Sequence, residues 1–191
     1  AFLVLFAWPG AARAEDKPLY LDSSRPVEER VEDLLSRMTL AEKVGQMNMP
    51  CVYLRQLGND PLAKQEGCRR FTLGALTDEI GPAGGFFTLA DNALQEGTRQ
   101  QALYFNELQK LAIEKTRLRI PLLQTEEGTH GVMCTGKTIF PEGLAIGSTW
   151  NMDLVRRIYA AAAREARSVG IHQLFTLVVE PNRDPRLGRN E

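Results

Sequence analysis

Apolar residues recur at helical spacing in three parts of the chain. One apolar stripe covers residues 26–38, and two longer stripes cover residues 98–117 and 151–170. Thr39 and Glu42 follow the first stripe as a T-x-x-E capping box, which is a typical start of a new helix. The last stripe begins with an asparagine cap and ends at a glycine. The pattern therefore predicts a helical lead-in, broken at Thr39, and two long helices after it.

Three short apolar runs lie between these helical stripes or follow them. The runs FTLGAL (71–76), IPLL (120–123) and FTLVV (175–179) have the length of strands. FTLVV is apolar almost throughout, which is typical of a strand buried on both faces. Strands that alternate with helices in this way predict an α/β fold with a parallel sheet. We interpret the glycine-rich stretch at 81–85 first as an ordinary connection and second as a loop that lets backbone approach a ligand.

The composition describes one ordinary globular domain. Of the 191 residues, 43% are hydrophobic and 25% are charged, and the 23 basic side chains nearly balance the 24 acidic ones. The net charge of −1 provides no surplus that would hold a nucleic acid or an anionic membrane surface. We therefore expect no nucleic-acid partner.

Residues 1–14 differ from the rest and indicate the remnant of a secretory signal peptide. The apolar run at 1–8 is too short for a bilayer helix, and the small-x-small triplet Ala12-Arg13-Ala14 follows it. We expect cleavage after Ala14, no membrane span, and export to the periplasm or the extracellular space. Residues 15–191 then remain for fold reasoning, and we expect them to be a fragment of a longer protein.

Cysteine and histidine spacing offers neither a metal site nor a nucleophile site. Cys51, Cys68 and Cys134 allow at most one disulfide with one thiol left over, and none of them forms a C-x-x-C pair. We interpret them as small buried or unpaired residues. With only two histidines, His130 and His172, neither a metal cluster nor a hydrolase triad can be assembled. His130 is therefore expected to make structural hydrogen bonds.

Dense polar clusters follow two of the predicted strands. Residues 124–131 follow IPLL, and residues 180–191 follow FTLVV. In parallel α/β folds the carboxyl ends of the strands form the binding crevice, so both clusters fall where ligands bind. Glu126 and Glu127 are neighbours in an extended segment and point to opposite faces, so at most one of them can face a ligand. That carboxylate either caps a helix or pairs with a base, or it accepts hydrogen bonds from the vicinal hydroxyls of a sugar.

Three arginines recur at every third residue in the second cluster. The planar guanidinium group can bind two oxygens at once, which suits adjacent sugar hydroxyls or a carboxylate. For Arg183 and Arg186 we favour an internal salt-bridge network with Asp184 and Glu180. Arg189 follows a glycine, which would let it approach a ligand closely.

Several motifs in a fixed order resemble one known family. They are PVEERV (26–31), MTLAEKVGQM (38–47), EEGTHG (126–131), TIFP (138–141), AREARSVGI (163–171) and RDPRLGR (183–189). Together they resemble the N-terminal barrel domain of glycoside hydrolase family 3, the family of β-glucosidases and β-xylosidases. The resemblance extends over essentially all of residues 15–191.

This resemblance implies an α/β fold of the (β/α)8 TIM-barrel type, incomplete here, with the first few strand-helix units after a helical lead-in. It also implies hydrolysis of terminal non-reducing β-D-glycosyl residues by a retaining mechanism, with an Asp nucleophile and a separate acid/base. No catalytic residue is expected in this chain, because the family carries both groups further along. The expected substrate-binding residues are Glu127, at the position of the family's sugar-binding Asp, and Arg189, which closes the arginine motif. The expected partner is an oligosaccharide or β-glycoside substrate, and no metal or cofactor is expected.

Three departures from the family pattern leave the sugar open. Glu127 is one methylene longer than the more common Asp, Leu187 replaces the usual Trp, and residues 180–181 are Glu-Pro where many relatives have Asp-Val. A β-xylosidase of the same family is therefore the first competitor of a β-glucosidase, with arabinose also open, while the branch that cleaves N-acetylglucosamine fits less well. The residues are also compatible with a non-catalytic carbohydrate-binding protein and with a purely structural fragment. Because a closed barrel needs about 250 residues, we expect this chain alone neither to fold stably nor to hydrolyse glycosides.

Overall fold

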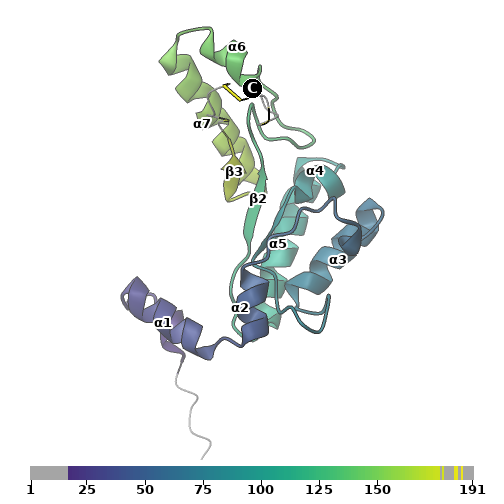
Figure 1. Cartoon of the computed structure of the whole chain (residues 1–191), viewed down its shortest axis with the longest axis vertical. Coiled ribbons are helices and arrows are strands. Elements are labelled where there is room, and N and C mark those ends of the chain that lie inside the picture. The colour runs from purple at the N-terminus through teal and green to yellow at the C-terminus, as the bar shows by residue number, and fades with distance from the viewer. Residues whose placement is uncertain (1–16, 177, 179–182, 185, 187–191) are drawn as a thin grey trace, which may run out of the picture. The chain divides into compact units, whose positions relative to one another are not determined.

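The computed structural model describes residues 17–176 together with residues 178, 183, 184 and 186 (Figure 1). The chain divides into two compact units, Ala1–Met38 and Thr39–Glu191, which are described separately. The predicted signal-peptide remnant at 1–14 and the predicted sugar ligand Arg189 lie outside the described residues. Within the described part, no helix is both long enough and apolar enough to cross a membrane.

The first unit holds a short 3-10 helix and one α-helix. The 3-10 helix η1 spans Leu19–Leu21 and α1 spans Val27–Arg37, which confirms the first predicted helix. The Tyr20 amide donates a hydrogen bond to a carboxylate oxygen of Asp33 at 3.0 Å, and Arg30 Nε donates one to the Tyr20 carbonyl, also at 3.0 Å. These two bonds attach the lead-in segment to α1.

Helix α2, Leu40–Gln46, opens the second unit with the predicted capping box. Thr39 Oγ1 accepts a hydrogen bond from the Glu42 amide at 3.2 Å, and the Thr39 amide donates one to Glu42 Oε2 at 2.9 Å. The Arg117 guanidinium donates to the same carboxylate at 3.0 Å. The hydrogen bond from Arg117, followed by those from Thr39, holds the pKa of Glu42 below its ordinary value.

A three-stranded parallel sheet lies at the centre of the second unit. Strand β1 spans Gly85–Phe87, β2 spans Leu123–Glu127 and β3 spans Gln173–Phe175, in the order β1-β2-β3. Helix α5, Thr98–Lys115, lies between β1 and β2 in the chain, and α7, Met152–Val169, lies between β2 and β3 (Figure 1). Parallel strands connected by helices make a mixed α/β fold, as predicted.

The prediction of a strand over residues 71–76 was wrong, because this run begins in the last turn of a helix. The remaining elements are η2 Arg55–Leu57, α3 Pro61–Thr72, α4 Leu89–Ala93 and α6 Gly143–Gly147. Asp60 caps α3 by accepting a hydrogen bond from the Ala63 amide at 2.9 Å, and Pro61 occupies its first turn. Within this run Phe71 is buried and packs edge-on against Phe86, with 6.2 Å between the ring centroids, whereas Leu73 is exposed.

The two other predicted strands exist with different bounds. Strand β2 begins at Leu123, the last residue of the IPLL run, and continues through the polar residues 124–127. Strand β3 shares only Phe175 with the predicted strand 175–179, of which residues 177 and 179 lie outside the described part. The strands pair through backbone amides and carbonyls, which every residue type here supplies, so polar side chains do not end them.

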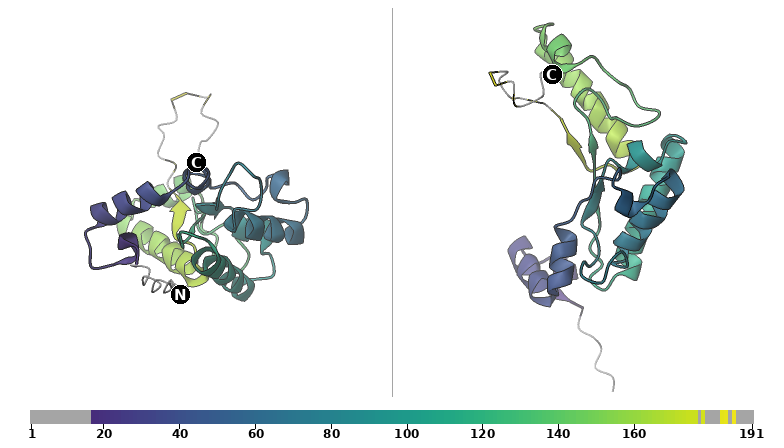
Figure 2. Two further views of the ribbon diagram at one scale, coloured as in Figure 1. Left: turned by 90° about the horizontal axis from the view of Figure 1, so that it is seen from below. Right: turned by 45° about the vertical axis from the view of Figure 1, so that its right-hand side comes forward.

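The apolar core lies between the sheet and the helices that cover one of its faces (Figure 2). Strand β1 contributes Phe86, and the helices α3, α4, α5 and α7 contribute most of the other buried side chains. These include Phe71, Leu89, Phe105, Leu108, Ala162, Ala166 and Val169. The opposite face of the sheet, which carries Phe87 and Phe175, takes no part in this core.

The glycine-rich stretch at 81–85 is explained by backbone that packs on backbone. A Cβ on Gly84 would lie 2.1 Å from the Gln46 carbonyl oxygen, and one on Gly85 would lie 1.8 Å from the Leu123 carbonyl oxygen. Neither position can hold a side chain, because the opposing atoms belong to the main chain of α2 and β2. Close packing accounts for these glycines without a ligand.

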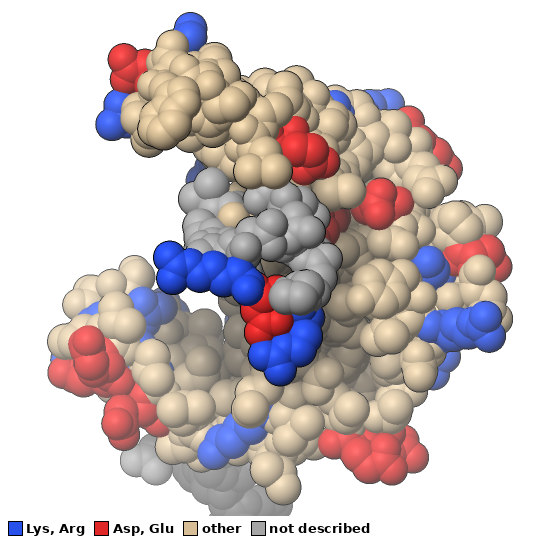
Figure 3. All heavy atoms as spheres, turned by 45° about the horizontal axis from the view of Figure 1, so that its top comes forward, with Lys and Arg blue, Asp and Glu red and all other residues tan. Residues whose placement is uncertain are grey.

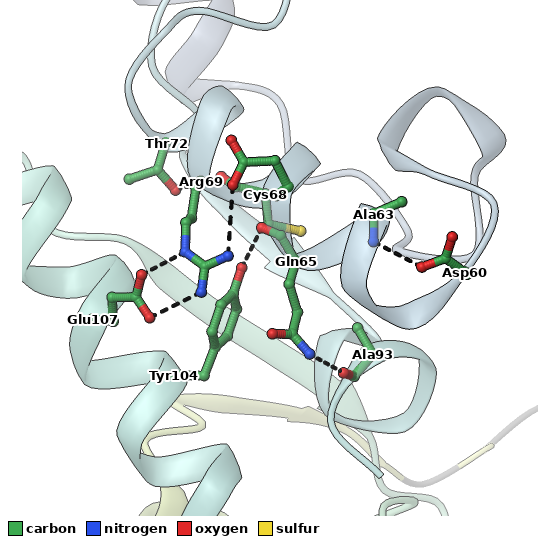
Figure 4. Close-up of polar contacts among 10 residues, drawn as sticks. Asp60, Ala63, Gln65, Cys68, Arg69, Thr72, Ala93, Tyr104 and Glu107 are labelled. Carbon is green, nitrogen blue, oxygen red and sulfur yellow. Dashed lines mark hydrogen bonds and ion pairs between the residues drawn. The ribbon is translucent and has the colours of Figure 1, made fainter. Parts of the chain in front are cut away.

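A partly buried polar network links α3 to α5 and α4 (Figure 4). The Arg69 guanidinium donates two hydrogen bonds to the Glu107 carboxylate and lies 4.9 Å from the centre of the Tyr104 ring. The Tyr104 hydroxyl donates to the Gln65 carbonyl, and Gln65 Nε2 donates to the Ala93 carbonyl at 2.8 Å. All of these groups satisfy one another, so the network is part of the scaffold.

Candidate functional site

At the end of β2 the side chains of Glu126 and Glu127 point to opposite faces of the sheet, as predicted. Glu126 has no exposed surface, whereas Glu127 is half-buried. Glu126 faces the helices, and Glu127 shares the other face of the sheet with Thr125. Only Glu127 can therefore meet a ligand that approaches the open face of the sheet.

Glu127 stands at the carboxyl end of the sheet without a bonding partner for its side chain. Among the described residues, no group donates a hydrogen bond to its carboxylate or pairs with it, and its own carbonyl accepts from the Met133 amide at 3.1 Å. In the register of the sheet, Glu127 is paired with Phe175 of β3. A half-buried carboxylate in this position is available to accept hydrogen bonds from a ligand.

Two aromatic rings lie on the same face as Glu127. Phe87 of β1 and Phe175 of β3 meet edge to face with their ring centroids 4.9 Å apart. Phe87 is paired in register with Thr125, and Phe175 with Glu127, so all four side chains lie on the face opposite the core, where Thr125 is buried beside Met49. The carboxylate therefore stands beside an apolar surface, an arrangement common in small-molecule sites.

The segment before η2 brings one further aromatic residue to this face. The Phe87 amide donates to the Pro50 carbonyl at 3.1 Å, and the Val52 amide donates to the Phe87 carbonyl at 2.9 Å, so this segment lies beside β1. Val52 is fully buried, Cys51 is half-buried and Tyr53 is exposed, and the Leu54 amide closes this turn by donating to the Cys51 carbonyl at 3.1 Å. The pKa of the exposed Tyr53 is raised first by its hydrogen bond with Cys51, and further by the Cys51 and Glu127 charges and slight burial.

Sequence reasoning missed Tyr53 because its segment shows no hydrophobic period. Cys51, Val52 and Tyr53 all count as hydrophobic, so the sequence contains no alternation that could have found Tyr53. The Glu127 charge acts on the Tyr53 hydroxyl, so this phenol lies near the carboxylate that is expected to bind the sugar.

Glu126 points the other way and caps α4. Its oxygens accept hydrogen bonds from the Ala90 amide at 3.1 Å and from the Glu127 amide at 3.2 Å, and the Asp91 amide bonds it as well. Burial raises the pKa of Glu126 to about 7, although these three amides act in the opposite direction. The helix that Glu126 caps precedes β2 in the chain, whereas the sequence alternative was a cap on the helix that follows the strand.

His130 makes structural hydrogen bonds, as predicted. Its Nδ1 lies 2.7 Å from the Phe140 carbonyl oxygen, and its Nε2 lies 3.2 Å from a carboxylate oxygen of Glu142. Gly131 follows with φ +121°, and a Cβ there would meet the Thr138 carbonyl at 2.2 Å. The Tyr159 hydroxyl donates to the Thr129 carbonyl at 2.9 Å and ties the same loop to α7.

A hollow of about 260 Å³ lies beside this loop, between α6 and α7. Its lining mixes the Glu142 carboxylate and the Tyr159 ring with the apolar side chains of Leu144, Ile146 and Val155. Because His130 already pairs with Glu142, the hollow offers little unsatisfied polar chemistry.

The arginine cluster is described only in part. Arg186 pairs with Asp184, as predicted, and this hydrogen bond raises the pKa of Arg186 and lowers that of Asp184. Glu180 and Arg189 lie outside the described residues, so the expected role of Arg189 as a sugar ligand stays a prediction. On the face drawn in Figure 3, basic and acidic side chains are interspersed, without a broad field of either sign.

Within the described part of the chain, no three potential ligands gather into a metal site. The three cysteines are free thiols, and burial raises the pKa of Cys68 to about 12 and that of Cys134 to about 11. Neither of these two thiols is poised as a thiolate near neutral pH.

Comparison with known proteins gives consistent similarities. Residues 39–191 match the model of the glycosyl hydrolase family 3 N-terminal domain. The chain is 34% identical over 173 residues to a Formosa agariphila protein named "Putative beta-xylosidase", covering 89% of this chain and 21% of that protein. It is 31% identical over 159 residues to the periplasmic beta-glucosidase of Salmonella typhimurium, and the match covers 83% of this chain and 17% of that protein.

A solved structure agrees with these relatives. A β-glucosidase from Erythrobacter marinus superimposes with a TM-score of 0.66 at 29% identity, covering 91% of this chain and 21% of that chain. The chain thus spans about a fifth of the length of the proteins it matches.

Proposed function

The chain belongs to glycosyl hydrolase family 3, and from this membership we propose that the full-length protein hydrolyses terminal non-reducing β-D-glycosyl residues. The relatives named as β-xylosidase and β-glucosidase support this reaction class. The observation that carries the proposal is the half-buried carboxylate of Glu127 at the carboxyl end of β2, which pairs with no side chain in the described part of the chain. We further propose that β1, β2 and β3 are strands of a (β/α)8 barrel, whose carboxyl ends form the active-site face.

Glu127 is the proposed ligand of the non-reducing-end sugar. An ionised carboxylate accepts hydrogen bonds on two oxygens, which matches the spacing of vicinal hydroxyls. The rings of Phe87 and Phe175 beside it would contact the apolar face of the sugar. Arg189 is the second proposed ligand, because a guanidinium fork can bind two adjacent hydroxyls.

The reaction itself is proposed to use groups outside this chain. A retaining glycosidase needs a carboxylate nucleophile and a second carboxylic acid that protonates the leaving oxygen. Within this chain Glu127 would hold the sugar, while Glu126 is turned away from the open face of the sheet. The contribution of residues 15–191 is therefore substrate binding.

Glucose and xylose are the two sugars that the relatives suggest. β-Xylosidase activity is the second candidate, favoured by the longer side chain of Glu127, which occupies more of the site than the Asp found more commonly in the family. A smaller sugar would fit beside it. A non-catalytic carbohydrate-binding protein is the competing hypothesis from another class.

Export from the cytoplasm is the proposed location. Residues 1–14 have the apolar run and small-x-small triplet of a signal peptide, and the Salmonella relative is named as periplasmic.

The test is an assay of the full-length protein on chromogenic β-glucosides and β-xylosides. We expect hydrolysis of at least one, and we expect Glu127→Ala to lower kcat/KM by about 10-fold to 100-fold, since hydrogen bonds to a charged group contribute about 1.5–3 kcal/mol. Glu114→Ala, an exposed carboxylate on α5, is the matched control and should leave kcat/KM unchanged.

The outcomes separate the competing functions. Sugar binding without hydrolysis would favour the carbohydrate-binding protein. A folded protein that neither binds nor cleaves any β-glycoside would refute the proposal. If Glu127→Ala and Glu114→Ala lowered kcat/KM equally, Glu127 would not be a sugar-binding residue.

A further inference from the structure

Glu126 is a buried carboxylate that the proposed sugar chemistry does not use. It has no exposed surface, and its partners are the main-chain amides of Ala90, Asp91 and Glu127. These amides belong to two segments, the first turn of α4 and the end of β2. One side chain therefore joins the backbone of Glu127 to the turn that follows β1.

The turn that Glu126 holds follows Phe87 directly and is strained. Thr88 has φ +59°, in the left-handed region that β-branched residues rarely adopt. The Thr88 amide donates to the Thr125 carbonyl at 3.3 Å, and the Ala90 amide donates to Glu126. These bonds hold the turn against β2 in spite of its unfavourable backbone.

A buried carboxylate is a costly choice for a purely structural cap. A neutral hydrogen-bonding side chain, or an apolar one with a rearranged turn, avoids the desolvation of a charge. A carboxylate, however, has acceptor sites on both oxygens and no donor, so it can serve three amides from two directions at once. An amide or a protonated carboxyl group cannot accept all three hydrogen bonds in this way, because its NH2 or OH group is a donor.

We propose that Glu126 is a positioning residue of the sugar site, which fixes the backbone of Glu127 relative to the Phe87–Phe175 pair. This inference rests on the proposed function, in which Glu127 binds the sugar. Glu126 itself touches no substrate. It acts by keeping the Glu127 carboxylate and the aromatic surface at a constant separation.

The protonation of Glu126 then affects sugar binding. The titratable groups that face it in the described part of the chain are Asp91 of α4 and Cys134 of the loop after β2. The Asp91 charge adds to the upward shift of the Glu126 pKa, and Cys134 stays a neutral thiol near neutral pH. Above about pH 7 the carboxylate accepts all three bonds, and below it the added proton displaces one of them. We expect sugar affinity to rise as the pH increases through this range.

The experiment measures monosaccharide binding and hydrolysis by the full-length protein at pH 5.5 and pH 8. Titration calorimetry gives the affinity for glucose and for xylose, and a chromogenic β-glycoside gives KM and kcat. The variants are Glu126→Gln, which keeps the shape and one acceptor, and Glu126→Ala. Glu107→Gln is the matched control, because it makes the same change in the α3–α5 network (Figure 4).

At pH 8 we expect Glu126→Gln to weaken sugar binding and raise KM by about 10-fold, with a smaller change in kcat, because ground-state binding is what it disturbs. At pH 5.5 the variant and the wild type should have the same sugar affinity and KM, since both then carry a neutral side chain at residue 126. Glu107→Gln should match the wild type at both pH values. If Glu126→Ala does not fold, the sugar affinity and KM of Glu126→Gln alone test the proposal.

Unchanged affinity and KM of Glu126→Gln at pH 8 would overturn the proposal and leave Glu126 as a helix cap only, even if its thermal stability differed. A loss of equal size at both pH values would also overturn it. A wild-type protein that binds sugar but hydrolyses nothing would refute the glycosidase reaction, while the affinity measurements still test Glu126. A wild-type protein that binds no sugar would refute both.

Discussion

Replacement of Glu126 by Gln should stabilise the protein at alkaline pH. The pKa of Glu126 in the folded state, about 7, lies above its ordinary value of 4.5. The contribution of such a group to stability is fully present below pH 4.5 and is lost as the pH rises through 7. Because each pKa unit corresponds to about 1.4 kcal/mol, the ionised carboxyl costs about 3 kcal/mol at pH 8.

Glutamine removes this cost but serves one amide fewer. The pKa of about 7 already includes the hydrogen bonds that the carboxylate accepts, so we expect Glu126→Gln to be about 2–3 kcal/mol more stable than the wild type at pH 8. At pH 5 the buried wild-type carboxyl is largely protonated, and the two proteins should be about equally stable. The same substitution would therefore weaken sugar binding and strengthen the fold at pH 8.

Thermal unfolding of the full-length protein at a series of pH values between 5 and 8 measures this difference. Subtracting the wild-type midpoint from that of the variant at each pH cancels the other titrating groups. Glu114→Gln, on the exposed surface of α5, is the control and should give a constant difference. A Glu126→Gln difference that does not change with pH would refute the assignment of a raised pKa to this buried carboxyl.

Three further substitutions test other parts of the fold in the full-length protein. The Nδ1 atom of His172 accepts a hydrogen bond from the Gln124 amide at 3.0 Å, and burial lowers the pKa of this imidazole. The neutral imidazole therefore contributes to the free energy of unfolding above pH 6.5, and this contribution is lost as the pH falls through the lowered pKa. His172→Asn, which keeps an acceptor, should remove that part of the acid sensitivity from unfolding curves at pH 4.5–7, and an unchanged curve would contradict this. Tyr104→Phe removes the hydrogen bond to the Gln65 carbonyl and should cost about 1 kcal/mol in urea unfolding, whereas a loss above about 3 kcal/mol would show a wider role. Phe86→Ala empties a fully buried site and should cost about 3–5 kcal/mol by the same measurement, and a cost below about 1 kcal/mol would place this ring outside the core.

The helices with local start and stop signals were predictable from the sequence. The capping box at Thr39 and Glu42 and the long helix between Asn151 and Gly170 are present in the structure at the predicted residues. These signals act through hydrogen bonds within a few residues, so no knowledge of the rest of the chain is needed. Helix α3 was missed because its apolar residues do not form one continuous stripe.

The strands were predicted less well because their burial depends on distant partners. The run 71–76 has the composition of a strand but lies at the end of α3, whereas β2 runs through polar residues. What makes β2 a strand is its position between β1 and β3, which a local pattern does not contain. The face alternation of Glu126 and Glu127 was predictable because it follows from the period of any strand.

The two sides of the candidate site were predictable to different degrees. Glu127 was proposed because it lies in a motif of fixed order that resembles one family, and the structure places it as the last residue of β2. Its neighbours Phe87, Phe175 and Tyr53 were not found, since they come from separate segments that only the sheet brings together.

The alternation at the end of β2 also has an evolutionary consequence. Two consecutive codons specify side chains that point to opposite faces of the sheet, so a substitution at residue 127 changes one face and leaves the hydrogen bonds of Glu126 with α4 intact. An insertion or deletion of a single codon within β2 would instead exchange the two faces and place Glu127 among the helices. Along this strand, natural variation should therefore appear as replacement of residues and hardly ever as a change in length.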